Sequence, residues 1–124
     1  MSPRVPLVYI AGPYTEPDPV TNTRQAVEMG LEIRSRLGVA VIIPHTSMLS
    51  DLMFPQELDY WYKYDLDILH ACDAVIRLIG YSEGADREVE FALEERIPVF
   101  NLSQASDWED LQKWRARWYE MHQV

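Results

Sequence analysis

Two acidic side chains in this sequence, Asp65 and Glu88, lie on helix faces that should otherwise be buried. Apolar residues recur at spacings of three and four along residues 56–72, and Asp65 falls on that stripe between Leu58 and Ile68. Burying a carboxylate without a partner is costly or raises its pKa. An acid at the centre of a buried face therefore needs a structural or chemical reason.

Glu88 has a comparable position along residues 84–96. It lies between Ala85 and Ala92, which should face the core, whereas Glu90 points to the solvated side. The structural explanation is that each acid caps a loop or pairs with a buried arginine. Paired carboxyl groups also suit glycosidic chemistry: one attacks or stabilises the anomeric carbon, and the other moves protons to the leaving group.

A turn that could bind an anion precedes the second of these helices. Ser82 and Gly84 follow an apolar run and stand at the expected helix start. Free backbone N–H groups at a helix N-terminus, with the serine hydroxyl, can bind a negatively charged group. The same residues fit an ordinary helix cap, and the nearby acids Glu83 and Asp86 count against a phosphate.

The elements that position these residues alternate between strand and helix. Strands are expected at residues 7–11, 39–43, 74–79 and 97–102, a loop with some local order at 45–55, and helices at 22–37, 56–72, 84–96 and 107–121, the last with Asp107 as N-cap. Because the strands are apolar throughout, both sheet faces should be covered. The predicted fold is a single domain over residues 1–124: a small doubly wound, flavodoxin-like parallel sheet with helices on both faces. Its ligand should bind beyond the carboxyl ends of the strands.

Composition excludes several classes of function. The 124 residues include 20 acidic and 11 basic side chains, a net charge of −9, which argues against binding a nucleic acid polymer but permits one local anion site. No apolar run approaches the ~20 residues of a membrane span, and the single cysteine, Cys72, cannot form an internal disulfide. We therefore expect a cytoplasmic protein without membrane association. The histidines match no metal-ligand spacing, and no metal or organic cofactor is expected.

Three blocks of the sequence resemble the nucleoside 2-deoxyribosyltransferase-like superfamily, which includes the nucleoside 2′-deoxyribosyltransferases and the (deoxy)nucleoside 5′-monophosphate N-glycosidases. They are residues 8–14 (VYIAGPY), 64–75 (YDLDILHACDAV) and 82–92 (SEGADREVEFA), the last leading into Ile-Pro-Val at 97–99. The resemblance spans residues 8 to 100 or so. It implies a small nucleoside or nucleotide as substrate and a homo-oligomer whose sites are completed across subunits.

The resemblance also implies roles for single residues. Glu88 takes the position of the family's nucleophile, and Asp65 that of the acid that assists the leaving base and the acceptor. Tyr9 matches the tyrosine of the opening strand, whose hydroxyl orients the nucleophile. The turn after that strand would bind substrate through Gly12, which allows close approach of the backbone, together with Pro13 and Tyr14.

The residue six positions before the nucleophile separates the two activities of the superfamily. The transferases tend to carry an acid there, which binds the sugar 5′-hydroxyl, whereas the N-glycosidases carry a serine, which binds a 5′-phosphate. Here the residue is Ser82, with Gly84 in the same turn. This favours cleavage of the N-glycosidic bond of a (deoxy)nucleoside 5′-monophosphate. The alternatives are a nucleoside 2′-deoxyribosyltransferase and, in another class, a non-catalytic nucleotide-binding module.

Other candidates have both a functional and a structural interpretation. The first loop lacks the basic residue that the hydrolases carry; Arg24 is the nearest base, and it is either a substrate contact or a solvated helix residue. His45 could contact the base or sugar, or be structural. On the last helix, Trp114 and Trp118 could pack in the core or form a homo-oligomer face. An interaction protein that uses these tryptophans is a further alternative.

Overall fold

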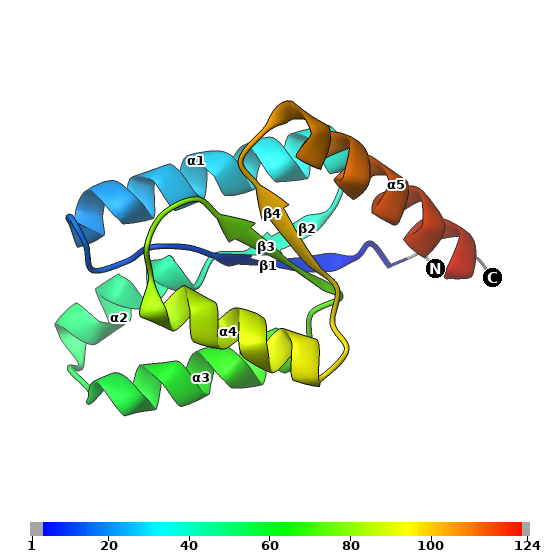
Figure 1. The fold of residues 1–124 in the computed structure, drawn as a ribbon. Coiled ribbons are helices and arrows are strands. Elements are labelled where there is room, and N and C mark those ends of the chain that lie inside the picture. The colour runs from blue at the N-terminus through cyan, green and yellow to red at the C-terminus, as the bar shows by residue number, and fades with distance from the viewer. Residues whose placement is uncertain (1–3, 123–124) are drawn as a thin grey trace.

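The structure is a computed structural model that describes residues 4–122. Over these residues four parallel strands form one sheet: β1 (Leu7–Ala11), β2 (Ala40–Ile42), β3 (Ala74–Leu78) and β4 (Val99–Leu102). Their order across the sheet is β2-β1-β3-β4, so the chain reverses its winding direction between β1 and β3 (Figure 1). This order confirms the predicted doubly wound, flavodoxin-like arrangement, and it places the expected ligand crevice between β1 and β3.

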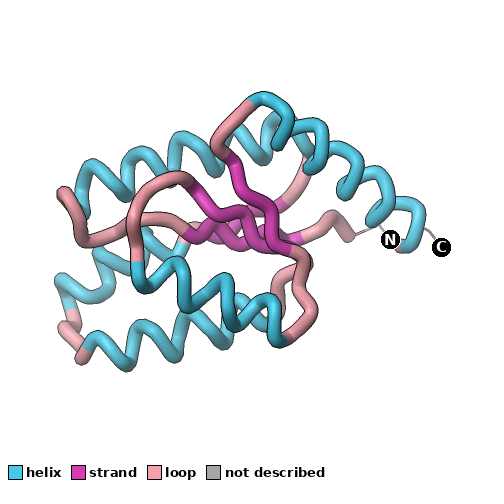
Figure 2. The backbone as a smooth tube through the Cα atoms, viewed as in Figure 1, coloured by secondary structure: helices cyan, strands magenta, loops and turns pink. Residues whose placement is uncertain are grey.

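The helices are α1 (Pro19–Leu37), α2 (Met48–Met53), α3 (Leu58–His70), α4 (Glu83–Glu94) and α5 (Ala105–Met121), with a 3₁₀ turn, η1 (Pro44–Ser47), before α2. Helices α1 and α5 cover one face of the sheet, and α3 and α4 cover the other (Figures 1 and 2). The sheet is therefore covered on both sides, as the apolar strands require.

Strand alternation divides the core into two clusters. Val8 and Ile10 of β1 and Ile76 of β3 pack against α1 and α5. Tyr9 and Val75 point the opposite way, toward α3 and α4. Successive residues of a strand face opposite sides of the sheet, so alternate side chains of each strand pack against different pairs of helices.

The C-terminal tryptophans belong to the first cluster. Trp114 and Trp118 are only 7% and 6% exposed, packed between α5 and the sheet. The prediction that they form a homo-oligomer face is wrong, because this chain's own core buries them. The further alternative of an interaction protein that binds through these tryptophans loses its basis for the same reason.

Three local predictions are also corrected. Helix α1 begins at Pro19, three residues before the predicted start, because Asp18 caps it by accepting from the Thr21 N–H at 2.9 Å. Helix α5 begins at Ala105 with Gln104 as its N-cap. Asp107 therefore lies one turn inside, where its carboxylate accepts from the Gln104 N–H at 3.0 Å.

The segment 45–55 is more ordered than a loop. It contains η1 and α2, and Asp51 of α2 accepts hydrogen bonds from the Gln56 N–H and from the Trp61 indole of α3. Leu58, predicted on the buried stripe of the following helix, is 80% exposed. It is the first residue of α3, and Leu69 at the other end of that helix is fully buried.

Candidate active site

A buried hydrogen bond joins the sheet to α4. The hydroxyl of Tyr9 donates to Oε2 of Glu88, with Tyr9 fully buried and Glu88 8% exposed. The alternation of β1 points Tyr9 toward α4, and the buried positions of α4, Ala85, Glu88 and Ala92, follow helical spacing. The spacing argument from the sequence thus placed Glu88 on the buried face of its helix.

Asp65 of α3 faces the same two groups. Its negative charge is close enough to raise the pKa of both Tyr9 and Glu88. Burial raises the pKa of Asp65 itself to about 7. Its Oδ1 atom is buried and has no hydrogen-bond partner among the residues that the structure describes. The structural explanation of a capped loop or a paired arginine is therefore not seen at that atom.

The two carboxyl groups differ in which form their surroundings favour. Burial raises the pKa of Glu88 to about 7, the Tyr9 hydrogen bond lowers it, and the charge of Asp65 raises it further. Tyr9 keeps its proton, because burial and the nearby acids raise its pKa far above the ordinary value. Within the described residues Glu88 accepts a hydrogen bond that favours its carboxylate form, whereas burial favours the protonated form of Asp65 and no hydrogen bond offsets it there. This is the division that a nucleophile and a general acid need.

The turn before α4 lies against the turn after β1. Gly80 has φ 124°, and a Cβ on it would lie 2.6 Å from Cγ of Pro13. Only glycine fits this conformation and this contact. Gly12, at the end of β1, is buried against Leu78 at the end of β3. The two turns predicted to bind substrate are therefore neighbours.

Ser82 is the N-cap of α4, and its hydroxyl oxygen accepts from the Ala85 N–H at 3.0 Å. This is the ordinary cap interpretation, and it leaves the hydroxyl proton available to a ligand. Gly84 lies exposed in the first turn of the helix. The N-terminus of α4 is the end from which backbone N–H groups can bind an anion.

His45 connects the end of β2 to the same region. It is 5% exposed, and its Nε2 lies 2.9 Å from the carbonyl oxygen of Pro13, to which it donates as the neutral ring. Burial lowers the pKa of His45. Its Nδ1 has no hydrogen-bond partner within the described part of the chain. The ring of Tyr14 packs edge-on against the imidazole, with the two ring centroids 6.0 Å apart.

A cavity of about 420 Å³ opens beside this histidine. The residues that line it include Pro13, Asn22, His45, Leu78 and Ile79. It lies at the carboxyl ends of the strands, on the side of α1, next to the turns that carry Gly12 and Gly80. Because α1 covers the face of the sheet opposite Tyr9 and Glu88, this cavity does not connect His45 with the two carboxyl groups, and the contact with Pro13 fits the structural interpretation of His45.

Arg24 stands apart from this group. Its guanidinium pairs with Glu28 at 3.0 Å on the exposed side of α1, and its side chain is 81% exposed. The geometry is that of the solvated helix residue considered from the sequence. An ion pair one turn along an exposed helix holds Arg24 where solvent surrounds it.

Arg77 of β3 was missed from the sequence. Among residues 4–122 its guanidinium donates to the carbonyl oxygen of Leu78, to that of Gly80 at 2.9 Å, and to Oδ1 of Asp86 at 3.1 Å. Its charge lowers the pKa of Glu88. The available signal was a single charged residue inside the apolar run 74–79.

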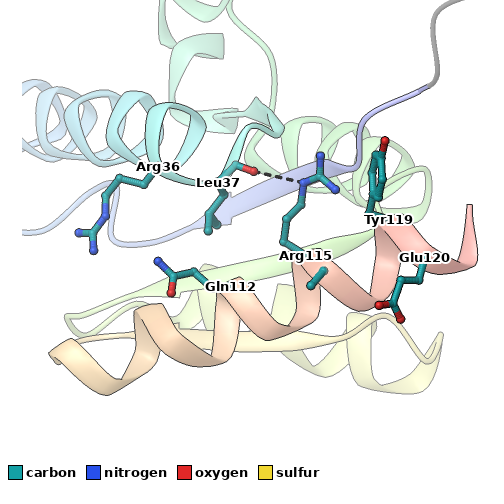
Figure 3. Close-up of a pocket in the computed structure, with 7 residues that line it drawn as sticks. Arg36, Leu37, Gln112, Arg115, Tyr119 and Glu120 are labelled. Carbon is teal, nitrogen blue, oxygen red and sulfur yellow. Dashed lines mark hydrogen bonds between the residues drawn. The ribbon is translucent and has the colours of Figure 1, made fainter. Parts of the chain in front are cut away.

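Another cavity, of about 390 Å³, lies between the ends of α1 and α5 (Figure 3). There Arg115 donates through Nε to the carbonyl oxygen of Leu37 at 3.2 Å, so the arginine satisfies the end of α1. This cavity is on the opposite side of the sheet from Tyr9 and Glu88. It contains none of the predicted site residues.

Within residues 4–122, no three His, Cys, Asp or Glu side chains are arranged to hold a metal ion. No helix in the same range is long and apolar enough to cross a membrane.

Comparison with known proteins places this chain in a family. The model of a domain of unknown function, DUF4406, matches residues 6–101. The chain belongs to this family. The match covers Tyr9, Asp65, Arg77 and Glu88, so the whole candidate site lies inside the DUF4406 domain. Among curated proteins, no sequence matches this chain.

Solved structures share the fold of this DUF4406 domain. A 2-deoxyribosyltransferase from Bacillus psychrosaccharolyticus aligns with a TM-score of 0.61 and 17% identity, over 86% of this chain and 90% of its own. A 2-desoxiribosyltransferase from Leishmania mexicana aligns with a TM-score of 0.58 and 20% identity, over 81% of this chain and 65% of its own. At these identities the likeness shows the fold, and at that level it supports the resemblance seen in the sequence.

Proposed function

We propose that this DUF4406 domain cleaves the N-glycosidic bond of a (deoxy)nucleoside 5′-monophosphate and releases the nucleobase. The observation that carries the proposal is the buried Tyr9–Glu88 hydrogen bond beside the unpartnered carboxyl of Asp65. Two carboxyl groups with pKa values of about 7 suit a reaction that needs one of them ionised and the other protonated near neutral pH.

The first step is attack by the Glu88 carboxylate on the anomeric carbon. As the new C–O bond forms, the C–N bond breaks and its electron pair moves to the base, which takes the proton of Asp65. The product is a glycosyl ester on Glu88. Tyr9 donates to Glu88 throughout, which fixes the orientation of the carboxylate before attack.

The second step removes the sugar from the enzyme. Asp65, now ionised, accepts a proton from a water molecule, whose oxygen attacks the anomeric carbon and breaks the ester bond. Glu88 returns as a carboxylate, Asp65 returns protonated, and the sugar phosphate leaves. A second nucleobase in place of water would give base exchange by the same intermediate.

The substrate's 5′-phosphate would lie at the N-terminus of α4, against Ser82 and the exposed backbone of Gly84. The turn of Gly12, Pro13 and Tyr14 would close over the sugar, and His45 would hold that turn in place through the carbonyl oxygen of Pro13, which lies 2.9 Å from its Nε2. Two acids at this helix start already have partners: Asp86 pairs with Arg77, and Glu83 accepts from the Tyr81 hydroxyl at 3.0 Å.

A nucleoside 2′-deoxyribosyltransferase is the second candidate, because the structures that share this fold include 2-deoxyribosyltransferases. The two activities differ in the acceptor, water or a second base. They also differ in the 5′ end of the preferred substrate, where Ser82 favours the monophosphate.

We further propose that the chain acts as a homo-oligomer through an apolar surface on α2 and the start of α3. Its side chains are each 46–80% exposed: Leu49, Leu52, Met53, Phe54, Leu58, Tyr60 and Tyr64. Soluble monomers rarely expose so many large apolar side chains within one short stretch. The surface lies on the helix that carries Asp65, so a second copy of the chain would border the site.

The deciding experiment measures base release from a panel of nucleosides and their 5′-monophosphates, each with and without a second free base. Wild type is compared with Glu88→Ala and with Glu90→Ala, which changes an exposed acid on the same helix. Free base from monophosphates, lost only in Glu88→Ala, supports the hydrolase. A new nucleoside formed only with the second base supports the transferase. Tight nucleotide binding without turnover in any condition would leave the non-catalytic binding module.

A further inference from the structure

We propose that Arg77 is the positioning residue of the candidate site: its guanidinium holds the turn after β3 against the start of α4, the helix that presents Glu88. The inference rests on the proposed function for its catalytic consequence. The contacts themselves stand on the structure alone.

The position of Arg77 follows from strand register. Ala11 of β1 pairs with Arg77 of β3, two residues after the pair formed by Tyr9 and Val75. Side chains two apart on a strand share a face. Arg77 therefore points to the face of the sheet that carries Tyr9 and that α4 covers.

The contacts of Arg77 join consecutive parts of the chain. Within the described residues, the guanidinium donates to the Leu78 carbonyl at the strand end, the Gly80 carbonyl in the turn, and Asp86 in the first turns of α4. The arginine side chain is 12% exposed and Asp86 is 63% exposed. Glu88 lies two residues beyond Asp86, so the same clamp fixes the helix that presents the nucleophile.

The chemistry of the clamp requires arginine. A planar guanidinium has five N–H donors and can serve two carbonyls and a carboxylate at once, whereas a lysine ammonium is a single compact charge. Placing a charge in an otherwise apolar strand costs desolvation free energy, so the position is filled only where its contacts offset that cost.

The charge acts on a site that is otherwise acidic. The groups that act on Glu88 are Tyr9 from β1, Asp65 from α3 and Arg77 from β3. Of these, Asp65 opposes the ionised form of Glu88, and burial opposes it more strongly. Tyr9 and Arg77 favour that form, one by a hydrogen bond and the other by its charge. Removing Arg77 should therefore raise the pKa of Glu88, so that a smaller fraction of the carboxyl group is ionised at a given pH.

The test uses ¹³C NMR to follow the titration of the Glu88 carboxyl carbon, assigned with Glu88→Gln. This readout needs no turnover, so it separates the inference from the proposed function. Arg77→Gln should raise the pKa of Glu88. The matched control Arg87→Gln, which removes an arginine of α4 whose guanidinium lies 4.8 Å from the centroid of the Tyr62 ring, should not. If base release is observed, Arg77→Gln should also move the acid limb of kcat/KM to higher pH, with a loss on the order of tenfold at pH 6.

Arg77→Lys tests the clamp apart from the charge. It should leave the Glu88 titration near that of wild type but increase amide hydrogen exchange at residues 80–85, because an ammonium cannot serve all the acceptors. An unchanged Glu88 pKa in Arg77→Gln, or equal shifts in Arg77→Gln and Arg87→Gln, would overturn the electrostatic part. Unchanged exchange at residues 80–85 in a folded Arg77→Lys would overturn the clamp, whichever substrate the protein takes.

Discussion

Tyr9 and Glu88 are 79 positions apart in the sequence, yet the phenol of one donates to the carboxylate of the other inside the core. The bond links the central strand β1 to α4, and it is buried between them. Since Glu88 is 8% exposed, burial is the main cause that raises the pKa of its carboxyl group, and the bond from Tyr9 is the largest effect that lowers it.

Tyr9→Phe removes only the hydroxyl that donates to Glu88. Because that bond lowers the pKa of Glu88, the variant should ionise Glu88 at higher pH and orient its carboxylate less well. We expect kcat/KM for base release to fall by about 10–100-fold, with the acid limb of the profile moved upward. Tyr119→Phe, which removes the hydroxyl of a 43% exposed tyrosine on α5, is the control. Equal losses in both variants would contradict a specific role for Tyr9.

Glu88→Gln should stabilise the fold at high pH. Burial raises the pKa of Glu88 to about 7 in the folded protein, from 4.5, so stability present below pH 4.5 is lost as the pH rises through about 7. Glutamine carries no charge to bury and can still accept from Tyr9. We expect a gain of about 2–3 kcal/mol in the free energy of unfolding at pH 8.5, and little at pH 4. Urea unfolding at both pH values measures it; a loss of stability at pH 8.5 would show that Glu88 is not strained by burial.

Ser82→Asp separates the cap from the substrate contact. Aspartate is a good N-cap, so α4 should keep its start and the protein its stability, whereas Ser82→Ala should lose about 1 kcal/mol. A carboxylate there repels a phosphate. We expect Ser82→Asp to lower kcat/KM for monophosphates at least tenfold while that for nucleosides holds or rises. Steady-state kinetics on each nucleoside and its 5′-monophosphate gives the ratio of their kcat/KM values. An unchanged ratio in Ser82→Asp would contradict phosphate binding at this turn.

Leu52→Asp tests the apolar surface on α2 and α3. Leu52 is 71% exposed, so a charge there should not disturb the fold of one chain but should prevent its burial between copies. We expect wild type to sediment as an oligomer and the variant as a smaller species. Leu93→Asp, on α4 and 63% exposed, is the control. A monomeric wild type would end the homo-oligomer proposal.

The sequence allowed the alternating fold and the inward face of Glu88 to be predicted, because both depend on local periodicity. It failed where the outcome depends on packing between elements. Leu58 has the right spacing for a buried stripe but begins its helix, and it stays exposed. Trp118 lies in the core because α5 packs on the face that α1 shares. Arg77 was missed because its partners are backbone carbonyls and an exposed acid, which no spacing reveals.

Helix α5 packs on the side of the sheet opposite Tyr9, Asp65, Arg77 and Glu88, and it supplies none of the contacts described among them. Substitutions along its buried stripe should therefore change the temperature at which the protein unfolds without changing the chemistry proposed for that site. Inherited variation on α5 and on α4 would then be subject to separate selection. A lineage could adapt to heat through one helix and to a new substrate through the other, with little conflict between the two.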